Sequence, residues 1–319
     1  MSQSHILVAD IGGTHARFSL VPDGGKPEEP SVWLTSMYET LGAALEDFMS
    51  RHTGVTVRAA ALCAAGPVMD GQIQMTNCPW TVDRHQIASV LKTDRIHLVN
   101  DFAAVALGLP GLTDGDLQPI ASDGKQMGDG PKVALGPGTG LGVAALVPDG
   151  RAGWIPVSGE GGHVDLAPAN NREISIIYQL TQEFGHVSAE RVLSGPGLET
   201  LYAALSALDG QVRDAKPTAV DIVGAARRRN DPHALEAVQL FTGWLGAVAG
   251  DLALTFGATG GVYLAGGILP QWGDLFDGEL FRRRFELKGR FNTYLDPMPT
   301  YLITAKDVAL RGLATLARA

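Results

Sequence analysis

The sequence opens with HILVADIGGTHARFSL (residues 5–20), in which an apolar stretch, a glycine pair and an alternating stretch follow one another. The apolar stretch predicts a buried strand that ends at Asp10. Apolar and polar residues then alternate from position 15 to 20, which predicts a returning strand with one buried face. The stretch therefore predicts a β-hairpin whose turn, Gly12-Gly13-Thr14, begins two residues after the carboxylate of Asp10.

A second unit of the same kind lies further along the chain. Residues 131–135 predict a strand, residues 136–142 read GPGTGLG, and residues 143–147 predict a returning strand. Helical spacing of apolar residues follows the β unit in both halves. We interpret the two units as an internal duplication. The alternative is a chance match of two glycine hairpins.

The remaining patterns alternate between strands and helices in the first half and are mainly helical after Pro168. We predict further strands at residues 31–36, 57–65, 72–76, 95–99 and 260–264. We predict helices at residues 40–51, 82–91, 102–109, 172–184, 188–193, 197–208, 218–228, from 231 onward, and 307–317. Residues 113–130, rich in Gly and Asp, are predicted to be a surface linker.

The helix that begins at Asp231-Pro232 is expected to be the longest, with an N-cap followed by proline in the first turn. It contains Gly243, Gly246 and Gly250, which weaken an isolated helix. We therefore expect these glycines to allow close packing against a neighbouring element.

The composition favours a folded enzyme of the cytoplasm. Of 319 residues, 45% are hydrophobic and 40 are glycine, and the formal net charge is −9. The acidic balance argues against binding to nucleic acid or to a membrane surface. The start of the chain lacks the basic region and the long apolar run of a signal peptide. Two cysteines, Cys63 and Cys78, fit a reducing compartment better than a disulfide scaffold.

The first glycine turn has the features of a phosphate site. Gly12 and Gly13 allow backbone N–H groups to approach an anion, and Thr14 adds a hydroxyl donor. Asp10 would repel a phosphate unless a cation lay between them, so it implies Mg²⁺ held through water. The alternative is an ordinary hairpin turn that is capped by the aspartate.

Two further glycine turns extend this hypothesis. Gly138 and Thr139 lie in the turn of the second β unit, so the two turns could hold a polyphosphate from both ends. Gly266 and Gly267 follow an apolar strand and could lie against the base or ribose of a nucleotide. The chain has neither a P-loop motif nor a G-x-G-x-x-G sequence that opens a helix.

Polar residues elsewhere are candidates for acid–base chemistry and sugar binding. Asn100 and Asp101 follow a buried strand, where Asp101 is well placed to accept a proton; its alternative role is a helix N-cap. Glu160 and His163 lie in a glycine loop, which favours hydroxyl binding over the helical geometry of a metal site. Glu190 is a further candidate, with a solvated helix start as its alternative.

Together these motifs resemble the bacterial glucokinases of proteobacterial type, within the superfamily of actin-like ATPases and sugar kinases. The resemblance covers most of the chain and rests on five segments in order: residues 9–14, 98–102, 136–142, 159–165 and 189–197. His15 and Pro137 stand where the family more often has Asn and Ala. Both adjoin the phosphate turns and leave the chemistry intact.

The resemblance implies a two-lobed α/β fold of the actin-like ATPase type, with duplicated ribonuclease H-like cores, inserted helices and an interlobe cleft. We place a small lobe at residues 1–111, completed by a helix at 304–319, and a large lobe at 112–303. The resemblance also implies a homodimer, glucose as phosphoryl acceptor and MgATP as donor.

The family's functional residues match positions in this chain. The resemblance implies that Asp101 is the catalytic base. It implies that sugar hydroxyls are bound by Asn100, Glu160, His163 and Glu190, and it places Asn77 near the sugar. It implies that phosphates are held by Gly12–Thr14 and Gly138–Thr139.

Two other functions remain open from the residues themselves. One is a kinase for another hexose, or one that uses polyphosphate as donor, because side-chain identity does not fix which stereocentre each residue contacts. The other is a sugar-binding sensor that hydrolyses little ATP. A sensor needs no catalytic base, so Asp101 and the paired turns favour the kinase.

Overall fold

The structure of the protein is a computed structural model. The structure describes the chain apart from residues 1–2, 76–77, 123–127, 212–215 and 319. The chain divides into two compact units. The first unit comprises Met1–Thr113, Ala152–Ser158 and Ala305–Ala319. The second unit comprises Asp114–Arg151 and Gly159–Thr304.

The first unit is built on a five-stranded sheet in the order β3-β2-β1-β4-β7. Its strands are β1 (Gln3–Ile11), β2 (His15–Pro22), β3 (Ser31–Leu34), β4 (Val55–Ala64) and β7 (Ile96–Asn100). β2 pairs with β1 antiparallel, whereas β4 runs parallel to both β1 and β7. The hairpin predicted from residues 5–20 is therefore confirmed.

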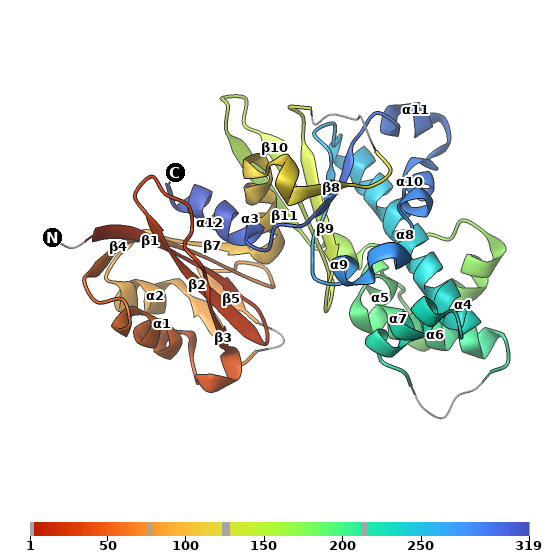
Figure 1. Cartoon of the computed structure of the whole chain (residues 1–319), viewed down its shortest axis with the longest axis horizontal. Helices are drawn as coiled ribbons and strands as arrows, with labels where there is room; N and C mark the ends of the chain where they lie inside the picture. The colour runs from red at the N-terminus through yellow and green to blue at the C-terminus, as the bar shows by residue number, and fades with distance from the viewer. Residues whose placement is uncertain (1–2, 76–77, 123–127, 212–215, 319) are drawn as a thin grey trace. The chain divides into compact units, whose positions relative to one another are not determined.

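Helices cover both faces of this sheet (Figure 1). On one face lie α1 (Leu41–Ser50) and α2 (Arg84–Leu91), and on the other lie α3 (Asp101–Gly108) and α12 (Val308–Arg318). Because neighbouring strand residues point to opposite faces, Leu7 packs in the core beneath α1 and α2. Val8 packs in the core beneath α3 and α12.

A second sheet has six strands in the order β11-β10-β9-β12-β13-β8, of which all but β11 lie in the second unit. Its strands are β8 (Leu117–Pro119), β9 (Lys132–Pro137), β10 (Leu141–Pro148), β11 (Trp154–Gly159), β12 (Val262–Leu264) and β13 (Thr300–Ile303). β10 is antiparallel to β9, and β12 is parallel to it. The first sheet has the same arrangement around β1, which agrees with the predicted internal duplication.

The expectation of a linker at residues 113–130 is wrong in part. Residues 117–119 form β8, which pairs antiparallel with β13 and contributes an edge strand. A further small sheet consists of β5 (Gln72–Gln74) and β6 (Thr81–Asp83) in the first unit.

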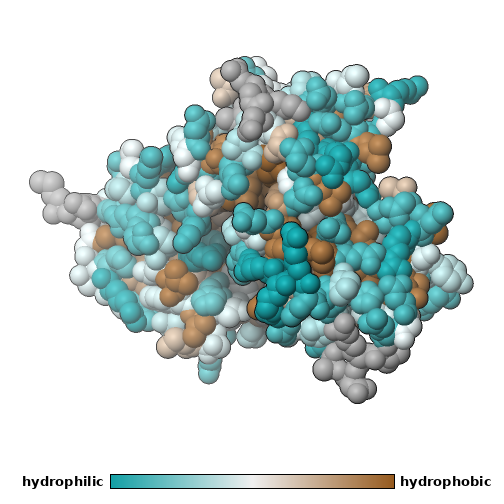
Figure 2. Space-filling model, turned by 45° about the vertical axis from the view of Figure 1, so that its right-hand side comes forward, coloured by the Kyte–Doolittle hydropathy of each residue, from teal (hydrophilic) through white to brown (hydrophobic). Residues whose placement is uncertain are grey.

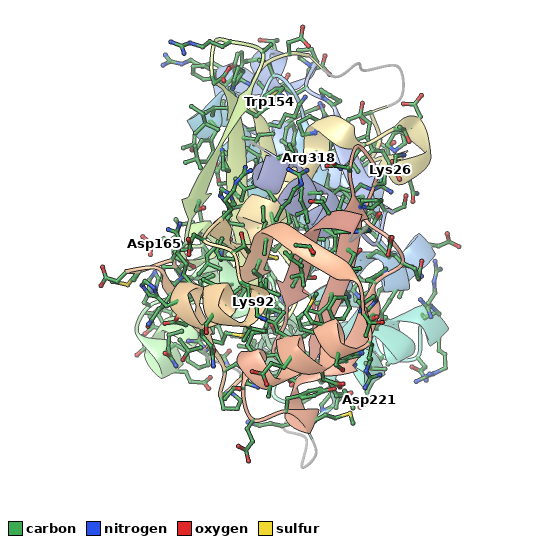
Figure 3. All side chains as sticks on the ribbon, turned by 90° about the vertical axis from the view of Figure 1, so that its left-hand side faces the viewer. Lys26, Lys92, Trp154, Asp165, Asp221 and Arg318 are labelled. Carbon is green, nitrogen blue, oxygen red and sulfur yellow. The ribbon has the colours of Figure 1, made fainter. Side chains whose placement is uncertain are left out.

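Helices make up most of the rest of the second unit. They are α4 (Asn171–Phe184), α5 (Ala189–Val192), α6 (Gly195–Leu208), α7 (Ala219–Arg228), α8 (Pro232–Phe256), α9 (Leu269–Trp272), α10 (Gly278–Glu286) and α11 (Asn292–Leu295). The sequence patterns did not predict α9, α10 and α11. Asp221, labelled in Figure 3, forms a capping box with Thr218 at the start of α7.

Short 3₁₀ helices complete the two units. They are η1 (Thr35–Met37), η2 (Leu109–Gly111), η3 (Asp114–Asp116), η4 (Gly161–His163), η5 (Gly273–Leu275) and η6 (Gly289–Phe291).

The central helix of the second unit is α8. It is long and apolar enough to cross a membrane by length and composition, but 67% of its most apolar window is buried inside the protein. A Cβ at Gly246 or Gly250 would overlap the backbone of α10. The expected close packing is therefore confirmed for these two glycines, whereas Gly243 has room for a Cβ beside Arg284. The face in Figure 2 is mainly hydrophilic, with hydrophobic residues in separate patches.

Candidate active site

The carboxyl ends of three parallel strands bring polar groups together in the first unit. Asp10 on β1 is in register with Cys63 on β4, and Cys63 is in register with Val99 on β7. Asn100 ends β7, and Asp101 begins α3 directly after it. The edge of this sheet therefore carries Asp10, Asn100 and Asp101, as is typical of ligand sites in open α/β sheets.

The buried thiol of Cys63 lies near both carboxylates. Its Sγ donates a hydrogen bond to Asp10 Oδ1 at 3.6 Å. Burial raises the pKa of the Cys63 thiol, and the negative charges of Asp10 and Asp101 raise it further. Cys63 therefore stays protonated and acts as a weak donor to Asp10.

Asp10 also has a cationic partner that the sequence analysis missed. Arg17 Nη1 lies 2.8 Å from Asp10 Oδ2, and the two residues face each other across the β1–β2 hairpin. The register of the predicted hairpin could have revealed this pair, because its short turn places position 17 opposite position 10.

The first glycine turn is held by one hydrogen bond of its own backbone and by two from Thr35. The Gly12 N–H donates to His15 O at 2.9 Å. The Thr35 hydroxyl donates to Gly13 O at 2.8 Å, and the Thr35 N–H donates to Thr14 O at 3.0 Å. Because the Gly12 N–H is used inside the turn, contact with an anion would fall to Gly13 and Thr14.

The structure separates the roles of Asn100 and Asp101 at the start of α3. Asn100 is the N-cap, and its Oδ1 accepts hydrogen bonds from the N–H groups of Phe102 and Ala103. Its Nδ2 donates to Gly66 O at 3.4 Å. Asp101 is the first residue of the helix and accepts from the Phe102 N–H at 2.8 Å. The alternative of Asp101 as a plain N-cap is therefore wrong.

The second glycine turn, Gly138–Gly142, connects β9 to β10 in the second unit and includes the first two residues of β10. The Gly138 N–H donates to Gly140 O at 2.7 Å, and Gly138 O accepts from the Gly195 N–H at the start of α6 at 2.9 Å. A Cβ at Gly138 would meet nothing within 4 Å. The turn is thus fixed on one side and open at Gly138.

Glu190, at the start of α5, lies against this turn. Its Oε2 accepts a hydrogen bond from the Leu141 N–H at 2.8 Å, and its Oε1 lies 3.9 Å from His163 Nε2. One hydroxyl oxygen could lie about 2.8 Å from both atoms, accepting from the imidazole and donating to the carboxylate. This spacing suits recognition of a sugar hydroxyl.

The segment that carries Glu160 and His163 rests on β10. A Cβ at Gly162 would overlap the Leu141 carbonyl, and one at Gly161 would lie 3.0 Å from the Val143 side chain. These glycines allow close approach of two protein segments, and both Glu160 and His163 remain exposed.

Several of the predicted residues line one cavity of about 220 Å³. Its lining includes Thr139, His163 and Glu190. No role was predicted from the sequence for its other lining residues, which are Ser188, Arg191, Ser194, Pro196, Gly197 and Thr200. Arg191 lies over the Phe184 ring at 4.2 Å, a pairing that no local sequence pattern reveals.

The loop that follows this segment, before α4, is tied to the residues that lead into α5. Asp165, labelled in Figure 3, is largely exposed, and its carboxylate lies 2.8 Å from His186 Nε2. Asp165 also forms a β-bridge with Ser188, the N-cap of α5. These contacts hold the loop beside Ser188, two residues before Glu190.

A second cavity, of about 250 Å³, lies beside the third glycine turn. Its apolar lining consists mainly of Leu198, Ala219, Val220, Val223, Ile268 and Trp272. Gly266 has a φ of +94°, and a Cβ there would lie 2.7 Å from Pro137 O, so this position requires glycine. Gly267 has open space around it.

Two further predictions concern Asn77 and the bound cation. Asn77 lies outside the described residues. In the part of the chain that the structure describes, no group of three or more His, Cys, Asp or Glu residues could hold a metal ion. A cation here would therefore depend on few protein ligands.

Comparison with known proteins supports one family. The family model described as Glucokinase matches residues 7–319. The glucokinase of Aromatoleum aromaticum is 45% identical over 316 residues, which cover 97% of this chain and 93% of that protein. A crystal structure of glucokinase from an Antarctic psychrotroph is 32% identical, covers 98% of both chains and has a TM-score of 0.89.

A more distant structure agrees in fold. The ROK family glucokinase from Streptomyces griseus, in complex with glucose and AMPPNP, is 22% identical with a TM-score of 0.62, and it covers 98% of this chain and 99% of that one. The predicted α/β fold of the actin-like ATPase type is confirmed. The match over nearly the whole chain, together with these motifs, shows that this protein belongs to the glucokinase family.

Proposed function

We propose that this protein transfers the γ-phosphoryl group of MgATP to the 6-hydroxyl of glucose, giving glucose 6-phosphate and ADP. The observation that carries the proposal is the placement of Glu190 and His163 in one cavity beside a glycine turn. The spacing of these side chains suits a hydroxyl, and the turn offers backbone groups to a phosphate. The glucokinase relatives support glucose and ATP as the substrates.

Asp101 is the general base in this proposal. Its carboxylate accepts the proton of the 6-hydroxyl while that oxygen bonds to the γ-phosphorus and the bond to the ADP oxygen breaks. Its position at the first turn of α3 supports this role, because the preceding Asn100 already caps the helix and Asp101 need not do so.

The sugar hydroxyls are assigned in this proposal to polar side chains. We assign the sugar hydroxyls to Asn100, Glu160, His163 and Glu190, and we place Asn77 near the sugar by resemblance alone. The exposed fraction of the His163 side chain, 58%, leaves its imidazole accessible to a ligand.

The donor phosphates are assigned to the two glycine turns. In the first turn the N–H groups of Gly13 and Thr14 and the Thr14 hydroxyl are the donors, because the Gly12 N–H is used internally. In the second turn the phosphates are assigned to Gly138 and Thr139. The N-terminus of α6, which is the positive end of the helix dipole, adjoins Gly138.

The nucleotide base is assigned to the apolar cavity beside Gly266 and Gly267. A purine ring is flat and largely apolar on its faces, and Leu198, Val223 and Ile268 offer matching walls. The open space at Gly267 leaves room for the ribose.

Asp10 is suited to hold Mg²⁺ through water. Mg²⁺ commonly binds one or two carboxylates plus substrate phosphates and keeps several waters. The Asp10 side chain is 21% exposed, and its Oδ1 has only a thiol as a described donor. When bound, the cation would neutralise charge on the phosphates.

We further propose that the protein is a homodimer that works in the cytoplasm. The family resemblance supports the dimer. The two cysteines support the compartment, because both are buried and free.

The proposal is tested by measuring ADP release with a panel of sugars and phosphoryl donors. We expect release that depends on glucose and ATP, with glucose 6-phosphate as product. Release without sugar would indicate an ATPase, and sugar binding without release would indicate a sensor. Faster turnover with another hexose or with polyphosphate would replace the assigned substrate.

A further inference from the structure

The carboxylate of Glu190 contacts two parts of the second unit at once. Its Oε2 accepts the Leu141 N–H at 2.8 Å and fills the space that a Cβ at Gly140 would need. Its Oε1 lies on the side of His163, in the cavity assigned to the sugar. The same side chain therefore contacts the glycine turn and the hydroxyl-binding pair.

The backbone around Glu190 is fixed as well. The Ser194 hydroxyl donates to Glu190 O at 3.0 Å, and the Ser188 side chain caps α5 by accepting from the Arg191 N–H. Glu190 is thus held between two capping serines. A displacement of its carboxylate must come from its own side-chain torsions, so the two contacts of the carboxylate depend on each other.

The segment that carries His163 meets the same turn residue. Gly162 packs against the carbonyl of Leu141, the same residue whose N–H donates to Glu190. Leu141 itself is buried. Both the sugar-binding segment and Glu190 therefore abut the backbone at the end of the turn.

We infer that Glu190 is a positioning residue for the phosphate turn Gly138–Gly142, in addition to its assigned role as a sugar ligand. This inference rests on the proposed function, because it takes the turn as a donor site and the cavity as an acceptor site. A carboxylate shared by both sites couples them, so that ordering it by one substrate favours the other. Gly140 is glycine because Glu190 occupies its side-chain space.

The first test is Gly140→Ala, which places a methyl group where Glu190 Oε2 lies. Glucose affinity is measured by calorimetry without nucleotide, so that any effect on phosphate binding does not enter. We expect glucose binding to weaken roughly tenfold or more, the value of one hydrogen bond to a charged group. The matched control is Gly111→Ala in η2, where a Cβ meets nothing within 4 Å.

The second test compares Glu190→Gln with Glu190→Ala. It distinguishes the contact of Oε2 with the Leu141 N–H from the proposed contact of Oε1 with the sugar. Glutamine keeps an oxygen that can accept the Leu141 N–H, so we expect ADP affinity close to that of wild type and weaker glucose binding. Alanine removes the acceptor, so we expect ADP affinity to fall as well. The Glu190→Ala substitution should also speed amide hydrogen exchange in residues 138–142 of the ligand-free protein, whereas Glu190→Gln should leave this exchange unchanged.

The outcomes distinguish this inference from the proposed function. Wild-type protein that does not bind glucose would refute the proposed function. The exchange measurement still tests the positioning role, because it needs no ligand. Unchanged exchange in Glu190→Ala, or unchanged glucose affinity in a folded Gly140→Ala protein, would overturn the inference.

Discussion

Arg17 Nη1 lies 2.8 Å from Asp10 Oδ2, so the carboxylate that precedes the first glycine turn has a cationic partner in its own hairpin. The Arg17 side chain is 46% exposed and that of Asp10 is 21% exposed. Exposed ion pairs contribute at most about 1 kcal/mol to stability. Asp10 can therefore serve two purposes, as the partner of Arg17 and as the proposed water-mediated ligand of Mg²⁺, and these can be tested separately.

Asp10→Asn should raise the Mg²⁺ concentration for half-maximal rate at fixed ATP by roughly tenfold, because the amide no longer attracts a hydrated cation. Arg17→Gln is the matched variant, which removes the ion pair and keeps the carboxylate. We expect it to leave the Mg²⁺ requirement unchanged or lower. If both variants raise the requirement equally, Asp10 acts only by holding Arg17.

Asp101→Asn should reduce kcat by about 10²–10⁴-fold, the usual contribution of a general base. The amide has a similar shape, and its oxygen can still accept the Phe102 N–H, so α3 should start normally. Glucose affinity, measured by calorimetry, should stay near that of wild type. A variant with wild-type turnover would exclude Asp101 as the base.

The sequence could predict the first sheet because its patterns are local. Apolar runs before Asp10 and Asn100 predict buried strands whose carboxyl ends carry polar residues. The structure has both strands, and it adds that each runs parallel to β4. β8 was missed because residues 117–119 read Leu-Gln-Pro, a three-residue edge strand with neither an apolar run nor alternation. Short elements such as α9 and α11 lack the length to show helical periodicity.

Contacts within the candidate site depend on chain segments that are far apart in sequence. The bond between Glu190 and the Leu141 N–H joins residues 49 positions apart, and only the folded backbone brings them together. The motifs identified Glu190 and the glycine turn separately. They did not show that Gly140 leaves space for the carboxylate, because a glycine has many other reasons to occur in a turn.

Stability of the first unit should fall as the pH drops from 7.5 to 5.5. Burial lowers the pKa of His97 on β7, and the positive charges of Arg95 and Arg84 lower it further. The unfolded chain, with an ordinary His pKa of about 6.5, therefore takes up protons that the folded state does not. The contribution of His97 to stability is fully present above about pH 6.5. It is lost as the pH falls through the pKa of His97 in the folded protein, which is lower.

This pH effect is measured by comparing wild type with His97→Gln. Urea midpoints at both pH values should show a smaller loss for the variant, because other titrating groups act equally in both proteins. Equal losses in the two proteins would show that His97 does not contribute.

Two glycines of α8 should respond oppositely to alanine. At Gly246 the new methyl group overlaps the backbone of α10 at Phe281, so Gly246→Ala should lower the free energy of unfolding by about 1–3 kcal/mol. At Gly243 the nearest atom to a Cβ is Arg284 Nη1 at 3.5 Å, an ordinary contact. Gly243→Ala should therefore be neutral or stabilising by up to about 1 kcal/mol, through the higher helix propensity of alanine.

Fluorescence of the neighbouring buried Trp244 during urea unfolding reports on both variants. A loss of stability of the same size in both would mean that helix packing against α10 does not explain the glycine at position 246.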